Sequence, residues 1–298
     1  MNITVIGCGE TGATISALLL SKFGQITLNI IDPDDGISGR ILDLEHASTC
    51  CDSEIRWNDF NSASDSDFLF FTAGTRGEKG EDRSKKAKVN KELIASIFSQ
   101  FQPKENALII TISNPTEVMS YWIYNYLKGK NLVVATGTGL DTSRLKSIIA
   151  KRLKKSVHEI NTIVLGEHGS NMTPIWSQTT ISGNSINQLA SKKQLEDFTT
   201  ELKNCATEIR KTEVATKYGV SHYAVSILSS YISKNNSRHI VSFPSDKIDL
   251  INSDNIFFSW PCQIGNSSIS AIQNIKMEEA EIEQLKQGIE AIKQTINL

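Results

Sequence analysis

The chain has 298 residues, of which 39% are hydrophobic and 21% are charged. This is the composition of an ordinary globular protein, and the length suits two domains of roughly 100 to 200 residues each. The formal net charge of -2 disfavours nucleic acid and anionic membranes as partners. We therefore expect the main partner to be a small molecule.

The sequence predicts neither membrane insertion nor export. No apolar stretch reaches the ~18 residues that span a bilayer, and residues 1–6 carry no basic flank or cleavage site. The five cysteines show no CxxC spacing and no cluster with histidines, so we expect reduced thiols and no metal site. These features predict a cytoplasmic protein.

The first half of the chain alternates short β-rich runs with helical patterns. The expected strands are residues 3–6, 27–31, 68–72, 107–112 and 132–136, and the expected helices are residues 11–22, 38–47, 85–100 and 116–127. Such alternation predicts parallel strands joined by crossover helices. We therefore expect an α/β fold with a doubly wound parallel sheet of five or six strands.

The pattern changes after residue 140. A helix through residue 155, a longer helix over 195–217 and an amphipathic helix over 277–296 are expected, with strands at 162–165, 239–243 and 256–260. This half reads as an α+β unit. We predict two domains, residues 1–140 and residues 141–298, with a boundary near residue 140.

A GxGxxG sequence, GCGETG at residues 7–12, directly follows the first strand and opens the first helix. In this context glycines allow a tight turn and close approach to a pyrophosphate at the helix N-terminus. Asp32 ends the second strand, where a carboxylate binds the adenine ribose and repels a 2′-phosphate. We predict a Rossmann domain that binds NAD through four residues, Gly7, Gly9, Gly12 and Asp32. The alternative is that the glycines only turn the chain and Asp32 caps the next element.

Three further segments resemble the L-lactate/malate dehydrogenase family: LDTSR at residues 140–144, GEHG at 166–169 and the arginine-containing loop at 72–83. GRILDLEH at 39–46, SNP at 113–115, PIWS at 174–177 and SWP at 259–261 also match, so the resemblance covers essentially the whole chain. The pattern is most similar to the bacterial L-lactate and L-2-hydroxyisocaproate branches. The resemblance implies hydride transfer between NAD and C2 of a 2-hydroxy or 2-oxo acid.

The resemblance also implies the catalytic and carboxylate-binding residues. His168 of the GEHG segment is the expected acid/base, and its ordinary pKa of ~6.5 suits proton exchange near neutrality. Asp141 is its expected partner and favours the imidazolium. Arg144 is expected to bind the substrate carboxylate through a planar two-point contact. Arg83 matches the loop arginine that polarises the substrate carbonyl.

Further positions receive roles from the same resemblance. Asn114 is expected to bind the substrate oxygen or the nicotinamide carboxamide, and Ser221 is expected to line the substrate pocket. Gly74 is assigned to the cofactor site. Gly77 stands six residues before Arg83, where lactate enzymes carry an amide and malate enzymes an arginine. We disfavour oxaloacetate on this ground and expect room for side chains larger than that of pyruvate.

The leading hypothesis is an L-lactate dehydrogenase that converts pyruvate and NADH to L-lactate and NAD. An L-2-hydroxyisocaproate-type or a malate dehydrogenase is the alternative within the same chemistry, since a one-residue loop shift would bring Arg76 into the pocket. A non-catalytic NAD-binding sensor is the alternative of another class. Retention of His168, Asp141, Arg144 and Arg83 together argues against the sensor. The family also implies a homodimer or homotetramer.

Overall fold

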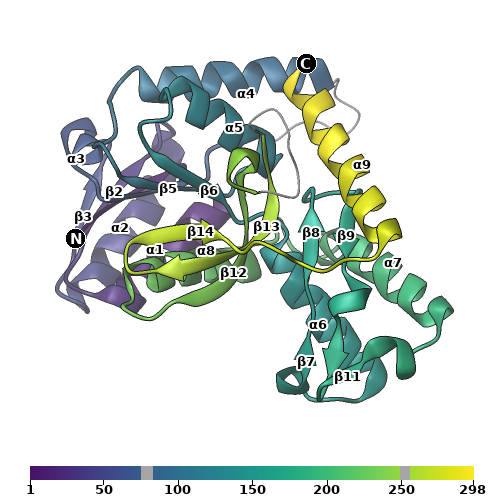
Figure 1. Cartoon of the computed structure of the whole chain (residues 1–298). Helices are drawn as coiled ribbons and strands as arrows, with labels where there is room; N and C mark the ends of the chain where they lie inside the picture. The colour runs from purple at the N-terminus through teal and green to yellow at the C-terminus, as the bar shows by residue number, and fades with distance from the viewer. Residues whose placement is uncertain (75–82, 249–255) are drawn as a thin grey trace. The chain divides into compact units, whose positions relative to one another are not determined.

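The computed structural model describes residues 1–74, 83–248 and 256–298, and for residues 83–86 it describes the backbone alone. The chain forms two compact units (Figure 1). The first unit comprises Met1–Ala135, Lys217–Leu228 and Thr295–Leu298, and the second comprises Thr136–Thr216 and Ser229–Gln294. The chain therefore enters the second unit at Thr136, and two later segments belong to the first.

The first unit contains a parallel sheet. In spatial order its strands are β3 (Glu54–Trp57), β2 (Thr27–Ile31), β1 (Asn2–Ile6), β4 (Phe68–Phe71), β5 (Leu108–Thr111) and β6 (Leu132–Ala135). The strand order reverses between β1 and β4, which makes their carboxyl ends a topological switch point, the place where such sheets bind ligands. The predicted doubly wound fold is confirmed.

Helices cover both faces of this sheet. Figure 1 shows α1 (Glu10–Phe23) and α2 (Ser38–Thr49) on one face, and α4 (Arg83–Phe98) and α5 (Thr116–Tyr126) on the other. A short helix, α3 (Phe60–Ser64), precedes β4. The central strands are fully buried runs of apolar residues, as expected for strands that are covered on both sides. This packing explains why their sequence pattern was readable.

The second unit combines an antiparallel sheet with helices. Its main sheet holds β12 (Ser237–Pro244), β13 (Phe257–Gly265), β8 (Val164–Gly166) and β9 (Met172–Pro174), with β14 (Ser268–Ala271) on β13. A small sheet holds β11 (Asn184–Ser185), β10 (Thr180–Ile181) and β7 (Ile160–Asn161). A buried apolar cluster that includes Leu145, Ile149, Phe198 and Leu202 joins α6 (Gly139–Leu153) to α7 (Lys192–Ile209).

The long helix predicted for residues 195–217 is wrong in extent. It begins earlier, because Ser191 and Gln194 form a capping box in which each side chain accepts the other's backbone N–H. It ends at Ile209, and a separate helix, α8, runs over Tyr218–Ile232. The residues of α8 are rich in aromatic and β-branched types, whose weak helix propensity hides a helix from sequence reasoning.

The C-terminal helix α9 (Glu279–Ile296) is anchored by a buried carboxylate. Glu281 is 7% exposed and accepts hydrogen bonds from Ser177 N, Ser177 Oγ and Glu278 N at 2.9, 2.5 and 2.9 Å. Further along the helix, Gly288 faces the main chain at Asn171, where a Cβ would lie 3.0 Å from the Asn171 carbonyl oxygen. Part of α9 is thus tied to the segment of chain that follows β8.

We expect Ser177→Ala to lower the unfolding temperature by several degrees, because hydrogen bonds to charged groups contribute about 1.5–3 kcal/mol each. Ser99→Ala is the control, since the Ser99 hydroxyl donates to a main-chain carbonyl at an exposed site. Thermal unfolding followed by circular dichroism measures both variants. Equal unfolding temperatures for the two variants would contradict the anchoring role of Glu281.

Candidate active site

The glycine-rich turn after β1 is held against the loop that follows β4. Gly7 has a φ of 89°, and a Cβ on it would lie 2.7 Å from the Ala73 nitrogen, so only glycine fits. Its N–H donates to the Ile31 carbonyl at 2.8 Å. Gly12 lies in α1 against the Gly7 carbonyl, where a side chain would collide. Two of the predicted glycines therefore have a steric reason to be glycine.

Asp32 lies directly after β2 and is bound to the same turn. Its Oδ2 accepts the Cys8 N–H at 2.6 Å and its Oδ1 accepts the Asp34 N–H at 3.0 Å. The structure thus brings Asp32 and the glycine-rich turn together, as predicted, at the switch point of the sheet.

The N-terminus of α1 is open. Gly9 is the N-cap, no side chain caps the helix, and no atom lies within 4 Å of a Cβ built on Gly9. The first N–H groups of a helix need acceptors and favour a negative charge. An uncapped helix N-terminus beside a glycine turn and a carboxylate fits the pyrophosphate and ribose of NAD.

An acid in the first turn of α1 would repel a bound diphosphate, and two cations offset its charge. Glu10 forms ion pairs with Arg40 at 2.9 Å and Lys217 at 2.8 Å, and Arg40 also donates to the Cys8 carbonyl at 2.5 Å. The Lys217 hydrogen bond, more than any other contact, lowers the pKa of Glu10. Sequence reasoning missed Arg40 and Lys217, because the pairs join residues 30 and 207 positions apart.

Gly74 and Asn114 lie after β4 and β5, on loops that a serine joins. Ser113 Oγ donates to the Ala73 carbonyl at 2.6 Å, and the Cβ of Ser113 would lie 3.7 Å from a Cβ on Gly74. Asn114 is exposed and precedes a cis peptide bond to Pro115. The predicted cofactor residues of the first unit thus follow the carboxyl ends of four parallel strands, β1, β2, β4 and β5.

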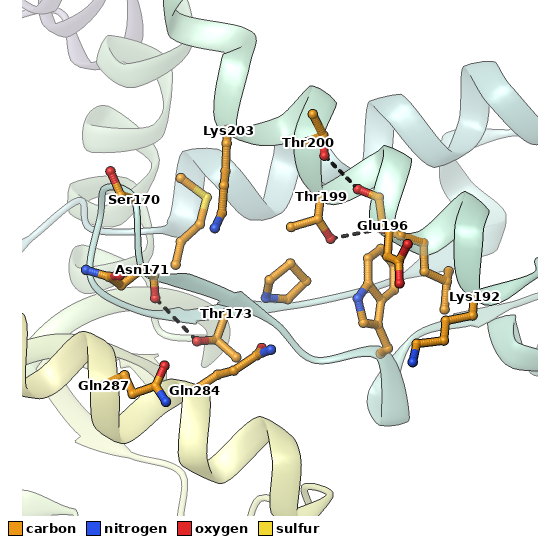
Figure 2. A pocket seen from close by; sticks show the side chains of 14 residues that line it. Ser170, Asn171, Thr173, Lys192, Glu196, Thr199, Thr200, Lys203, Gln284 and Gln287 are labelled. Atoms are coloured by element: carbon orange, nitrogen blue, oxygen red, sulfur yellow. Dashed lines mark hydrogen bonds between the residues drawn. The ribbon is translucent and has the colours of Figure 1, made fainter.

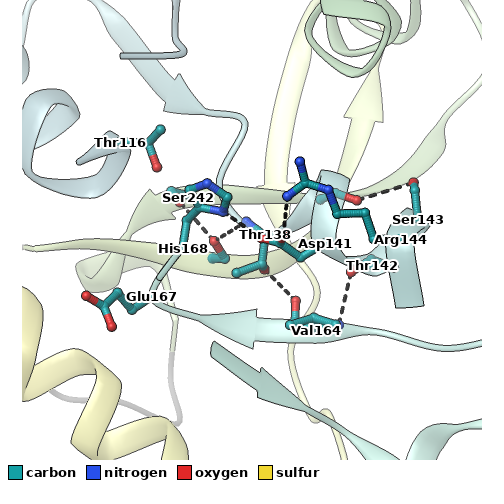
Figure 3. Close-up of polar contacts among 12 residues, drawn as sticks. Thr116, Thr138, Asp141, Thr142, Ser143, Arg144, Val164, Glu167, His168 and Ser242 are labelled. Atoms are coloured by element: carbon teal, nitrogen blue, oxygen red, sulfur yellow. Dashed lines mark hydrogen bonds and ion pairs between the residues drawn. The ribbon is translucent and has the colours of Figure 1, made fainter. Parts of the chain in front are cut away.

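A histidine and an arginine share one buried carboxylate in the second unit (Figure 3). Asp141 lies in the first turn of α6 and its side chain has no exposed surface. His168, two residues after β8, places Nδ1 2.5 Å from Asp141 Oδ2, and Arg144 NH1 lies 2.9 Å from Asp141 Oδ1. Three of the predicted site residues are therefore in contact.

Electrostatics keep Asp141 ionised. Burial by itself would raise the pKa of Asp141, but the hydrogen bond and charge of His168 and the charge of Arg144 outweigh burial and lower it. An ionised carboxylate only accepts hydrogen bonds, so His168 Nδ1 is the donor. The contact thereby selects the imidazole tautomer with its proton on Nδ1.

Arg144 is suited to bind a carboxylate. Its side chain is 14% exposed, and NH1 is held by Asp141. Within the described part of the chain, Asp141 is the hydrogen-bond partner of this guanidinium. The planar guanidinium has five N–H donors, so it can bind a second carboxylate by two parallel hydrogen bonds.

The outcome differs for three other predicted residues, Ser221, Arg83 and Gly77. Ser221 belongs to α8 within the first unit, is fully buried, and donates to the Thr11 carbonyl at 3.3 Å. It thus supports the start of α1, and its role in a substrate pocket stays a prediction. Arg83 begins α4, but its side chain lies outside the described part of the chain, and Gly77 lies outside the described residues.

A pocket of about 550 Å³ borders α7 and α9 in the second unit and contains none of the predicted site residues (Figure 2). Its cations, Lys192 and Lys203, lie apart in Figure 2. Lys203 follows Lys192 by eleven positions of α7, which is a rise of roughly 16 Å along the helix. They do not form one anion site. Thr199 and Thr200 donate their hydroxyls to main-chain carbonyls of α7. We assign no ligand to this pocket.

The described residues contain neither a candidate metal site nor a candidate membrane span. No group of three histidine, cysteine or acidic side chains is arranged to hold a metal ion there. None of the described helices is long and apolar enough to cross a membrane.

Comparison with known families covers nearly the whole chain. A model of the lactate/malate dehydrogenase NAD-binding domain matches residues 1–133, and a model of the lactate/malate dehydrogenase alpha/beta C-terminal domain matches residues 138–298. The chain is 30% identical to an L-lactate dehydrogenase of Clostridium botulinum, over 99% of this chain and 96% of that protein. It is also 30% identical to a malate dehydrogenase of Chlorobium limicola, over 100% and 98%.

Solved structures share the fold. A minor L-lactate dehydrogenase of Enterococcus mundtii superimposes with a TM-score of 0.85 at 22% identity, over 99% of this chain and 97% of that one. Malate dehydrogenase of Plasmodium falciparum gives a TM-score of 0.85 at 23% identity, with the same coverage. The predictions of family, fold class, NAD as cofactor and enzyme class are confirmed. The chain belongs to the lactate/malate dehydrogenase family, the NAD-dependent oxidoreductases of 2-hydroxy acids.

Proposed function

We propose that this chain is an L-lactate dehydrogenase, which reduces pyruvate with NADH to L-lactate. The observation that carries the proposal is the shared carboxylate of Asp141, which binds His168 on one oxygen and Arg144 on the other. The first contact orients the imidazole of His168, a group that exchanges protons near neutral pH. The second holds the guanidinium of Arg144, a group that binds carboxylates. A 2-oxo acid has both a carbonyl oxygen to protonate and a carboxylate to bind.

NAD supplies the hydride acceptor for alcohol oxidation and, as NADH, the hydride donor for reduction. In the proposal the uncapped start of α1 and Gly9 bind its pyrophosphate, and Asp32 binds the adenine ribose. Arg40 and Lys217 neutralise Glu10, so that this acid does not repel the pyrophosphate. Gly74 and Asn114 complete the set of residues assigned to the cofactor.

His168 carries the proton of the reaction in this proposal. Its Nδ1–H remains bound to Asp141, and Nε2 gives a proton to the oxo oxygen during reduction or takes one from the hydroxyl during oxidation. The negative charge of Asp141 stabilises the imidazolium, and its hydrogen bond fixes the orientation of the ring. Arg144 holds the substrate carboxylate, and Arg83 polarises the carbonyl.

Lactate is the favoured substrate, and two alternatives share the same chemistry. The chain is similar to L-lactate dehydrogenases, whereas a malate dehydrogenase matches at the same identity. Gly77 lacks the side chain that an arginine would offer to the second carboxylate of oxaloacetate, which supports lactate over malate. It also leaves room for the larger substrates of an L-2-hydroxyisocaproate-type enzyme.

We also propose that the enzyme acts as a homodimer or homotetramer in the cytoplasm. The proposal of an oligomer is based on membership of the family. The proposed location in the cytoplasm, a reducing compartment, is supported by the five cysteines, which are all free thiols. Burial raises the pKa of Cys8 to about 11, so this thiol of the glycine-rich turn stays protonated at neutral pH and is a weak nucleophile.

The acid/base assignment predicts the effect of two substitutions. His168→Asn is expected to lower kcat by about 100-fold or more, since general acid–base catalysis contributes ~10²–10⁴-fold. Asp141→Asn is expected to lower kcat and to move the pH midpoint of kcat/KM to lower pH, because the imidazolium loses its negative partner. Steady-state rates with pyruvate between pH 5 and 9 measure both effects. Unchanged rates for His168→Asn would rule out the assignment.

Asp141 also predicts how stability depends on pH. Because its pKa is lowered in the folded chain, the carboxylate stabilises the fold above the ordinary value of ~3.9. That contribution is lost as the pH falls through the lower folded-state pKa. We expect the unfolding temperature of wild type to drop over this acid range and that of Asp141→Asn to drop less. The same drop in unfolding temperature for the two proteins over this acid range would contradict this.

The cofactor assignment predicts a contrast between two glycines with open surroundings. At both Gly9 and Gly39, a Cβ placed on the backbone would have no atom within 4 Å, so alanine fits the protein at either position. Gly9→Ala is expected to weaken NADH binding, because its methyl group lies where the pyrophosphate approaches the backbone. Gly39→Ala is the matched control and should keep wild-type affinity. Fluorescence titration with NADH measures both, and equal affinities would place the pyrophosphate elsewhere.

The substrate assignment is tested with a panel of 2-oxo acids. We expect pyruvate to give the highest kcat/KM, 4-methyl-2-oxopentanoate measurable turnover, and oxaloacetate the lowest value. Preference for oxaloacetate would favour a malate dehydrogenase. Tight NADH binding without turnover of any of the three would favour the non-catalytic sensor.

A further inference from the structure

Two threonine hydroxyls bind the main chain of one strand residue, Val164 of β8. Thr138 Oγ1 donates to the Val164 carbonyl at 2.5 Å, and the Val164 N–H donates to Thr142 Oγ1 at 3.0 Å. Thr138 is the N-cap of α6 and Thr142 lies in its first turn. Figure 3 shows both contacts converging on Val164. The start of α6 is thereby fastened to β8 at two points.

The strand needs these partners. Val164 pairs with Pro174 of β9, and the neighbouring Ile163 carbonyl accepts the Ile175 N–H at 3.0 Å. Main-chain groups of successive strand residues point to opposite sides, so those of Val164 point away from β9. Val164 is fully buried, and buried main-chain groups require hydrogen bonds. On that side β13 pairs with β8 at Gly166, and at Val164 the threonine hydroxyls supply the hydrogen bonds instead.

The Thr138 hydroxyl does not cap its own helix but donates to the Val164 carbonyl. A threonine at an N-cap usually accepts an N–H from the first turn of its own helix, but Thr138 makes no such bond. Its own N–H donates to Ser259 Oγ at 2.8 Å. The preceding residue, Gly137, has a φ of 46° and would collide with the Ser259 and Ser242 hydroxyls if it carried a side chain. The chain entering α6 is therefore held from several sides.

The two fastened elements carry the proposed proton-exchanging pair. Asp141 stands between Thr138 and Thr142 on α6, and His168 follows Val164 by four residues. The distance between Asp141 and His168 thus depends on how α6 starts against β8. We propose that Thr138 and Thr142 are positioning residues that set the contact between Asp141 and His168. This inference rests on the proposed function, in which that pair exchanges the substrate proton.

Removal of the Thr142 hydroxyl tests the proposal, because Thr142→Val keeps the shape of the side chain. We expect kcat for pyruvate reduction to fall by about 10- to 100-fold, as for other residues that orient a functional side chain through hydrogen bonds. The pH midpoint of kcat should move to lower pH, while the NADH dissociation constant should stay unchanged. Thr138→Val should act in the same direction. Thr142→Ser retains the hydroxyl and should recover most of kcat.

Thr162→Val is the matched control. Thr162 and Thr179 are buried in the same unit and share a hydroxyl–hydroxyl bond at 2.9 Å. This variant should lower the unfolding temperature but keep the kcat and pH profile of wild type. If Thr142→Val and Thr138→Val behave like Thr162→Val, the hydroxyls are only structural and the inference is overturned. Absence of pyruvate turnover in wild type itself would instead overturn the proposed function, and this inference with it.

Discussion

A carboxylate without exposed surface is stable in a folded chain only when donors and cations replace its lost water, because removal from water costs several kcal/mol. Asp141 is such a carboxylate, and His168 and Arg144 are its replacements. The first turn of α6 adds a favourable helix dipole. The contacts that keep the charge buried are also the contacts that orient an imidazole and a guanidinium. Stability and proposed chemistry therefore depend on one arrangement in the second unit.

The first unit solves a related charge problem at its glycine-rich turn. An open helix N-terminus attracts a diphosphate, yet Glu10 places an acid in its first turn. Arg40 and Lys217 pair with this acid, and Arg40 also binds the carbonyl of Cys8. The pairs are partly exposed, so each stabilises the fold only slightly. Their larger proposed effect is to cancel the negative charge of Glu10, which would otherwise repel a bound pyrophosphate.

Much of the fold was readable because the buried parallel strands are continuous apolar runs and each is followed by a helical pattern. β3 was missed, since it is a short edge strand with charged Glu54 and Arg56. α8 was missed because its many aromatic and β-branched residues have weak helix propensity. At the site, the resemblance pointed to Asp141, His168 and Arg144. The hydroxyls of Thr138 and Thr142 bind main-chain atoms of Val164. Because main-chain atoms do not depend on the residue type, the sequence could not predict these contacts.

The central claim is that ionised Asp141 holds the proton of His168 on Nδ1. NMR of the protein with ¹⁵N-labelled histidine measures this directly, because the nitrogen shifts distinguish the two tautomers. We predict a protonated Nδ1 on His168 throughout the titration, with Nε2 as the nitrogen that loses its proton as the pH rises. A neutral ring protonated on Nε2 would contradict the claim, since the hydrogen bond to Asp141 would then be absent.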